Sequence, residues 1–314
     1  MSAEILTPGL QTTLQGGHRY GFRHFGMPWA GAADMVSLAY ANALVSNAYD
    51  AIAMEVSFGG CRLGFEQPAV IALAGAPAAA QLNDHSLDFY RSIRVEAGDV
   101  LSLQHPTAGV RTYIAIMGGF SGRDVLGCKS TYLPARLGGH EGRALATGDR
   151  IGYTPTTSSP PMRELPAQLH PTFLKSWSLR VTPSGETSLL TPQSHQHLAE
   201  SVFSVSHRCD RMGFALEGPK LDIASDGLMQ SAAVFPGTIQ CPENGVPFTL
   251  GVDAQTTGGY PRIASVALCD QHLLGQCRPG DRIQFLIRTP RQARQAHLAK
   301  QDMLRDWLPG FRLC

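Results

Sequence analysis

The sequence predicts a mainly β protein built from two related β-barrels, on three observations. The 314 residues include 33 glycines and 21 prolines, so turns are frequent and strands are favoured over long helices. Hydrophobic residues make up 43% of the chain, which is enough to bury a core. Short apolar runs lie on both sides of one compositional break, at residues 69–74, 111–117, 248–252 and 282–287, and glycine directly follows the first two.

A repeated turn also indicates duplication. Gly-Asp pairs at residues 98–99, 148–149 and 280–281 each follow a polar turn and precede an apolar run. A Gly-Asp turn that leads into a strand is a common device of hairpins. Further strands are therefore expected at residues 100–103 and 150–153.

The compositional break covers residues 154–171, where threonine, serine and proline crowd together. Such a run resists regular structure. The expected organisation is an N-terminal barrel over residues 1–154, a linker over 155–171, a second barrel over 172–288 and a C-terminal helix within 289–314.

Three helices are expected from their capping signals. Asp34 is suited to cap a helix that ends near residue 47. Thr191-Pro192 and Thr289-Pro290 each place a capping hydroxyl before a proline, which the first turn tolerates. They predict helices to about residue 202 and to residue 307 or 308.

The charge balance excludes some partners. Lysine and arginine total 26 against 25 acidic residues, without a basic stripe, which argues against nucleic acid and against an anionic membrane surface. Charged residues are only 16% of the chain, below the roughly 25% of average domains, so another protein is expected to cover part of the surface. We find no long apolar span and no signal-peptide pattern, and the seven scattered cysteines form no C-x-x-C pair. We therefore expect reduced thiols in a cytoplasmic protein.

Residues 122–130 approach the phosphate-binding pattern G-x-x-x-x-G-K-[ST]. Cys128 stands between the second glycine and Lys129, and Pro134 limits the helix that should follow. A P-loop is not expected, although a phosphate contact by other means stays open.

Two polar segments contain charged and hydrogen-bonding side chains that a hydrophobic core does not require. Residues 210–213 place Asp210 and Arg211 just before a glycine. Residues 253–262 combine donors and acceptors with a Gly-Gly pair that lets the backbone approach a ligand, and they end in an arginine suited to grip a carboxylate or phosphate. A polar turn with a buried pairing is an equally weighted alternative.

A third cluster of polar residues and glycines lies near the N-terminus, at residues 15–19 and 31–34. Asp34 is most simply a helix cap, and Arg19 is more often a surface cation than a ligand.

Several motifs occur in order between about residue 5 and residue 288. They are residues 8–15, 31–34, Glu55 with 58–60, 118–119, 210–213, 216–218, 236–242 and 255–264. Together these motifs resemble one known family, the C subunits of 5-oxoprolinase. This is the KipA-like family, also described as biotin-dependent carboxyltransferase or allophanate hydrolase subunit 2.

The resemblance implies two cyclophilin-like β-barrels and a heteromeric complex. The partners would be the KipI-like B subunit and the A subunit of 5-oxoprolinase, and the complex would convert 5-oxoproline into L-glutamate with ATP hydrolysis. A related arrangement, fused in one chain, forms the carboxyltransferase part of urea carboxylase. Residues 255–261 are more similar to the oxoprolinase branch.

On this resemblance the chain is expected to position and stabilise a transferring phosphate. Two sets of residues are expected to do so: catalytic Asp210, Arg211, Asp253 and Arg262, and substrate-binding Arg19, Asp34, Gln240, Gln255, Thr256, Thr257, Gly258, Gly259 and Tyr260. ATP would be shared with the partner subunits. No dedicated metal site is expected, although Asp253 or Asp210 has oxygens suited to Mg²⁺. Biotin is not expected, because the chain has no Met-Lys attachment site.

The first turn departs from the family pattern, because Gly16 stands where an aspartate is usual and His18 replaces a glycine. Two alternatives stay open: a biotin-dependent carboxyltransferase acting on urea or another amide, and a non-catalytic KipA-like antagonist of a KipI-like kinase inhibitor. The leading hypothesis places Arg211 and Arg262 in one pocket that a second polypeptide completes.

Overall fold

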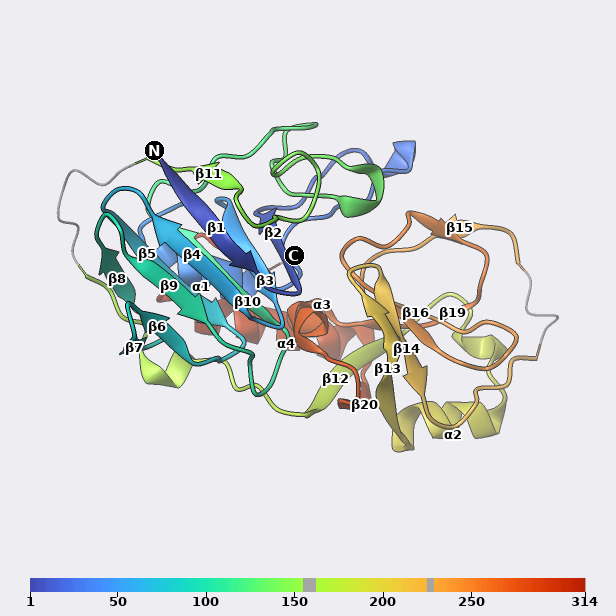
Figure 1. The fold of residues 1–314 in the computed structure, drawn as a ribbon. Helices are drawn as coiled ribbons and strands as arrows, with labels where there is room; N and C mark the ends of the chain where they lie inside the picture. The colour runs from blue at the N-terminus through green and yellow to red at the C-terminus, as the bar shows by residue number, and fades with distance from the viewer. Residues whose placement is uncertain (155–161, 225–228, 314) are drawn as a thin grey trace. The chain divides into compact units, whose positions relative to one another are not determined.

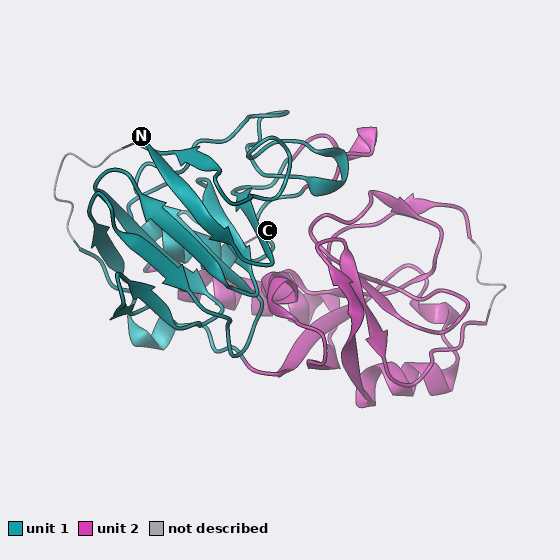
Figure 2. Cartoon of the chain, viewed as in Figure 1, with its two compact units in different colours: residues 1–19, 30–173, 307–311 teal, residues 20–29, 174–306, 312–314 magenta. Residues whose placement is uncertain are grey.

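The computed structural model describes residues 1–154, 162–224 and 229–313 and confirms the mainly β class, with four α-helices among those residues (Figure 1). Part of the predicted linker, residues 155–161, lies outside the described residues. The chain forms two compact units, which Figure 2 colours separately. Unit 1 comprises residues 1–19, 30–173 and 307–311, and unit 2 comprises residues 20–29, 174–306 and 312–314.

Unit 1 contains two antiparallel sheets, which in the described chain have the orders β11-β1-β4-β9-β6-β7 and β2-β3-β10-β5-β8. Their strands are β1 (Ser2–Pro8), β2 (Gln11–Gln15), β3 (Ala53–Ser57), β4 (Cys61–Phe65), β5 (Ala69–Gly75), β6 (Ala80–Leu82), β7 (His85–Leu87), β8 (Ser92–Val95), β9 (Val100–Leu103), β10 (Arg111–Ile116) and β11 (Arg150–Gly152). The barrel predicted for the first half takes the form of these two sheets around one core.

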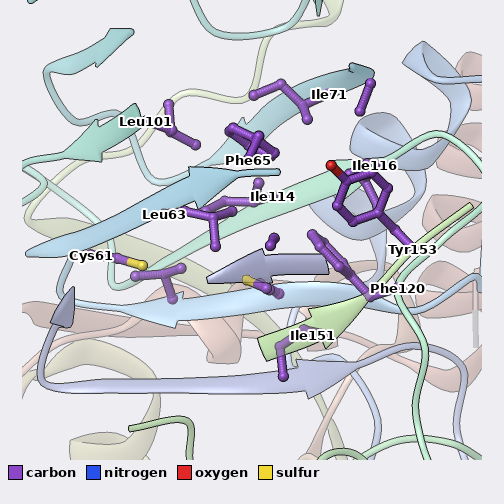
Figure 3. Close-up of a cluster of buried hydrophobic side chains, with 14 of the residues drawn as sticks. Cys61, Leu63, Phe65, Ile71, Leu101, Ile114, Ile116, Phe120, Ile151 and Tyr153 are labelled. Carbon is purple, nitrogen blue, oxygen red and sulfur yellow. The ribbon is translucent and has the colours of Figure 1, made fainter. Parts of the chain in front are cut away.

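The core of unit 1 lies between the two sheets (Figure 3). Leu63 of β4 and Leu101 of β9 meet Ile71 of β5 and Ile114 of β10, and all four are at most 1% exposed. Every residue of β5 and β10 is buried, because α1 (Met35–Leu44) covers the other face of their sheet. Such two-sided burial gives the continuous apolar runs seen in the sequence.

Helix α1 begins where the sequence predicts, since the Asp34 carboxylate accepts hydrogen bonds from the amides of Val36 and Ser37 at 3.1 and 3.0 Å. It ends at Leu44, about one turn earlier than expected. Asn47 instead donates from its side chain to the carbonyl of Ile116 at 2.8 Å, so this residue fixes the loop after the helix.

Unit 2 contains a closed barrel with the order β12-β19-β16-β17-β14-β13-β20 in the part of the chain that is described, which confirms the barrel predicted for the second half. Strands β12 and β20 pair in parallel, and the other barrel pairs are antiparallel. The strands of unit 2 are β12 (Ser176–Pro183), β13 (Val202–Asp210), β14 (Gly213–Glu217), β15 (Ala232–Ala233), β16 (Thr238–Gln240), β17 (Phe248–Leu250), β18 (Thr257–Gly258), β19 (Arg262–Val266) and β20 (Arg282–Ile287).

The capping signals locate two further helices, α2 (Pro192–Glu200) and α4 (Pro290–Arg305), each two to three residues shorter than expected. α3 (Leu268–Gln271) was not predicted, because its N-cap Ala267 offers no capping side chain. The short 3₁₀ turns are η1 (Arg23–Phe25), η2 (Leu133–Ala135), η3 (Ala167–Leu169), η4 (Thr187–Leu189) and η5 (His272–Gln276).

The three Gly-Asp turns share one geometry. Gly98, Gly148 and Gly280 have φ of +91°, +89° and +85°, which is the left-handed region that glycine adopts without steric cost. Each following aspartate accepts a hydrogen bond from the amide three residues before it, at 2.7, 2.7 and 3.1 Å. The repeated pattern in the sequence therefore corresponds to a repeated turn, found in both units.

Within the described residues, no helix has both the length and the apolar character that a membrane span requires. The six cysteines of the described chain are thiols rather than disulfides. Burial raises the pKa of the Cys61 thiol to about 11 and that of Cys241 to about 12.

Candidate functional site

Arg262, the last residue of the predicted loop, makes hydrogen bonds through its whole guanidinium group and through its amide. Its Nε and Nη2 donate to the two carboxylate oxygens of Glu186 at 2.7 and 2.6 Å. Its Nη1 donates to the carbonyl of Ala233 at 2.9 Å, and its amide donates to Glu186 at 3.0 Å. Such a two-point contact fixes the plane of the guanidinium, which stays 24% exposed.

Hydrogen bonds from Arg262 hold the pKa of Glu186 below its ordinary value. The stabilisation from this pair is therefore present above the unfolded pKa of about 4.3 and is lost as the pH falls through the lower folded pKa. We expect Arg262→Gln to raise the pKa of Glu186, as followed by NMR titration of carboxyl carbons in ¹³C-glutamate-labelled protein. An unchanged Glu186 titration in the variant would show that the pair does not form in solution.

Arg262 lines a cavity of about 580 Å³ in unit 2. Its apolar walls include Trp29, Phe235 and Leu268, and the last two are 48% and 46% exposed. Polar groups reach it from β12, β16, β19 and α4, and no acidic residue is among the described residues that line it. Of the predicted site residues, Arg262 is the one found among those lining residues. A partly apolar hollow of this size with a few polar groups is typical of small-molecule sites.

The remainder of the predicted loop is built around Gln240. This buried side chain donates a hydrogen bond to the carbonyl of Tyr260 at 3.2 Å and so fixes the position of the loop. A Cβ at Gly258 would lie 2.6 Å from the Gln240 amide nitrogen, so a larger residue there would displace the end of the Gln240 side chain. Thr257 and Gly258 form β18, which pairs with β15, and Gln255 and Thr257 are exposed. Thr256 and Gly259 are partly buried and Tyr260 is 47% exposed.

Arg211 and Asp253 form a buried ion pair. The guanidinium donates to both carboxylate oxygens at 2.8 and 2.9 Å, and the side chains are 4% and 2% exposed. Neither residue is among those that line the cavity beside Arg262. The expectation that Arg211 and Arg262 share that pocket is therefore wrong: Arg211 faces inward, toward a carboxylate of its own barrel.

The two aspartates suggested for Mg²⁺ do not form a ligand set. Both Asp253 oxygens accept hydrogen bonds from Arg211, and Asp210 accepts one from the amide of Met212 at 2.7 Å. Across residues 1–154, 162–224 and 229–313, no group of three or more histidine, cysteine or acidic side chains is placed to hold a metal ion. These residues do not fit a bound Mg²⁺.

The third cluster, at residues 15–19 and 31–34, contains residues with mainly structural roles. Arg19 is 1% exposed and donates to the carbonyls of Val125 and Ser130 at 3.1 and 3.0 Å, so the expectation of a surface cation is wrong. Asp34 is 2% exposed, and its carboxylate is occupied by the helix cap and by the Ser37 hydroxyl at 2.6 Å. Both residues order the chain around this segment, and neither lines the cavity of unit 2.

Beside that cluster, unit 1 has a polar hollow of about 290 Å³. His18, Asp50, Asp124 and Lys129 line it, together with Gly17 of the first turn and with Gly118, Gly119 and Gly127. Lys129 is followed by irregular chain and the 3₁₀ turn η2, with no helix N-terminus, so the geometry of a P-loop is not formed. The hollow still offers both signs of charge to a small polar ligand.

The unusual Gly16 directly precedes Gly17, which lines this hollow, and it is tightly packed. A Cβ there would lie 2.7 Å from the carbonyl oxygen of Asp50, and the amide and carbonyl of Gly16 are held by Ser130 and Ala32, each at 2.9 Å. Restoring the family's aspartate by Gly16→Asp should therefore cost about 1–3 kcal/mol of unfolding free energy. Gly122→Ala is the control, because its Cβ would be 3.6 Å from the nearest atom. Equal denaturation midpoints for the Gly16→Asp variant and the parent chain would contradict this account.

Glu55, another residue of the family pattern, lies in a buried network of unit 1. It accepts hydrogen bonds from Arg111 at 3.2 Å, from the Tyr113 hydroxyl at 2.7 Å and from the amide of Ala33 at 2.9 Å. Burial, together with the nearby Glu55 charge, raises the pKa of Tyr113 well above its ordinary value. The network ties the 31–34 segment to β3 and β10.

Comparison with known proteins identifies the family to which this chain belongs. A family model described as "Carboxyltransferase domain, subdomain A and B" matches residues 25–287, and the chain belongs to this family. The C subunits of the 5-oxoprolinases of Escherichia coli and Haemophilus influenzae are 36% and 33% identical to it, over 95% and 90% of both chains. The crystal structure of the K. lactis urea amidolyase matches 98% of this chain with a TM-score of 0.90 and 28% identity, and this chain covers 20% of that enzyme. The resemblance to the C subunits of 5-oxoprolinase is confirmed.

Proposed function

We propose that this chain is the C subunit of an ATP-dependent 5-oxoprolinase and works with the KipI-like B subunit and the A subunit of that enzyme. The observation that carries the proposal is the similarity to two proteins named as C subunits of 5-oxoprolinase, which match this chain over nearly their whole length. Their naming as one subunit of several implies a complex, and the low charge fraction of 16% is consistent with a surface covered by partners.

In the proposed reaction the γ-phosphoryl group of ATP moves to the lactam oxygen. A lactam is stabilised by resonance and is a poor electrophile, so this transfer makes water attack and C–N cleavage easier. The overall reaction consumes ATP and water and releases ADP, phosphate and L-glutamate. The contribution of the protein is to position the groups and to stabilise the charge that develops.

Among the expected catalytic residues, we assign Arg262 to the reacting groups. It is held rigidly by Glu186 and faces the cavity of unit 2. Arg211 and Asp253 would act as positioning residues, since their pair anchors the start of the loop from which Arg262 follows. Gln240 and the 255–260 segment would shape the approach to Arg262.

The direct test is reconstitution with the two partner subunits, ATP and 5-oxoproline, following glutamate release. We expect glutamate formation to depend on this chain. The same rate with and without the chain would contradict the proposal, whichever partner binds ATP.

A second candidate is carboxyl transfer to urea or another amide within a biotin-dependent system. The structural match to the urea amidolyase favours it, because the whole of this fold is present in that enzyme. This chain would then need a separate biotinylated carrier. Transfer of labelled carboxyl from carboxybiotin to urea, measured in the same reconstituted mixture, separates the two functions.

A further inference from the structure

Helix α4 builds one wall of the cavity in unit 2, and this wall lies outside the residues matched by the family model. The match to the family model ends at residue 287, whereas α4 begins at Pro290. Pro290, Ala293, Arg294 and His297 all line the cavity. Their i, i+3, i+4, i+7 spacing places them along one face of the helix.

Several contacts fix the position of α4, so the side chains that it contributes to the cavity have defined positions. The Thr289–Gln292 capping box fixes the first turn, and Leu304 near the last turn is fully buried. Between them, Lys300 Nζ is 2.8 Å from the ring nitrogen Nε2 of His272, which begins η5. The helix cannot rotate its cavity-facing side without breaking these contacts.

The charge around the cavity is positive and partly uncompensated. Arg262 and Arg294 both line it, and among the described residues no acidic side chain does. Glu186 neutralises Arg262, but Arg294 makes no ion pair or hydrogen bond within the described chain. An exposed arginine beside an apolar surface is suited to bind a carboxylate through its planar fork.

His297 adds a second polar group one turn from Arg294. Its Nδ1 is buried and has no hydrogen-bond partner in the described structure. Leaving such an atom unsatisfied costs free energy. Because His297 lines the cavity, a rotation of its ring on ligand binding would bring Nδ1 to a ligand oxygen and recover that cost. The apolar neighbours Trp29, Phe235 and Leu268 can cover the carbon atoms of the same ligand.

We propose that Arg294 and His297 bind the carboxylate of the substrate and so select a lactam that carries a carboxylate over a neutral amide. The identity of this substrate as 5-oxoproline rests on the proposed function, but the site itself rests on the cavity. Urea has no carboxylate and would leave Arg294 without a counter-charge. Arg294 and His297 would therefore be specificity-determining residues of this chain.

The test compares 5-oxoproline with 2-pyrrolidinone, which is the same lactam without the carboxylate. Binding is measured by equilibrium dialysis of the labelled ligands against the assembled enzyme without ATP. We expect 5-oxoproline to bind at least about 10-fold more tightly, and Arg294→Gln to remove most of that difference. Arg291→Gln is the matched control, because Arg291 is exposed on the same helix and does not line the cavity.

A kinetic measurement separates substrate binding from folding. With ATP, Arg294→Gln should raise the KM for 5-oxoproline about 10-fold with little change in kcat, and Ala293→Trp, which fills the cavity, should also raise KM. Equal binding of the two lactams, or equal effects of the Arg294 and Arg291 variants, would overturn the inference and leave the proposed function intact. Arg294-dependent binding of 5-oxoproline without any glutamate formation would support the inference and contradict the proposed function.

Discussion

Replacing Asp253 with alanine is expected to lower the free energy of unfolding by about 3–5 kcal/mol, because it leaves the Arg211 guanidinium buried without its counter-charge. The pair is 4% and 2% exposed and makes two hydrogen bonds, so solvent cannot replace the lost carboxylate. Chemical denaturation followed by tryptophan fluorescence measures the effect.

Two further variants make this prediction specific. Asp210→Ala removes a neighbouring exposed carboxylate and should cost about 1 kcal/mol or less. The double variant Arg211→Met with Asp253→Leu should recover most of the stability, since well-packed apolar residues often replace a buried ion pair without loss. A cost for Asp253→Ala as small as that for Asp210→Ala would mean that the pair is not buried in solution.

Replacing Arg262 with lysine should reduce glutamate formation by about 100-fold in the assembled enzyme. Lysine keeps the positive charge but cannot reproduce the planar fork that now contacts Glu186 and Ala233. Removal of one preorganised donor to a developing charge commonly costs about 10²–10³-fold in rate. The assay is the rate of glutamate release at saturating ATP and 5-oxoproline.

Arg180→Lys provides the matched control. Arg180 makes a similar two-point contact with Asp270, at 2.8 and 2.5 Å, in the same barrel, and it does not line the cavity. Its substitution should affect stability as much as Arg262→Lys while leaving the rate nearly unchanged. Partner binding by Arg262→Lys is measured first, because the comparison requires the assembled enzyme. If both variants then lose activity equally, the claim that Arg262 takes part in the chemistry is contradicted.

The local features of the fold could be predicted from the sequence because their causes are local. Asp34, Thr191 and Thr289 cap the helices that follow them through contacts within three residues. The buried strands β5 and β10 are apolar runs whose sequence shows their two-sided burial. In contrast, the unpredicted α3 has no capping side chain, so no local signal marked its start.

The candidate site was predictable only in part, because its contacts join residues far apart in the chain. Arg262 was identified from its loop, but Glu186, which holds it, lies 76 positions away and belongs to no motif. Arg19 was expected at the surface, yet its partner Ser130, 111 positions away, draws it into the interior. Arg294 and His297 were missed because their spacing fits any amphipathic helix, and only the barrel packed beside α4 makes them part of a cavity.

The central claim, that this chain serves the ATP-dependent opening of 5-oxoproline, is tested most directly by offering the assembled enzyme two reactions side by side. One mixture contains ATP and labelled 5-oxoproline, and the other contains urea and carboxybiotin with its label in the carboxyl group. We predict labelled glutamate in the first mixture, in amounts that follow ADP release, and no labelled carboxyurea in the second. Carboxyl transfer to urea without glutamate formation would contradict the account.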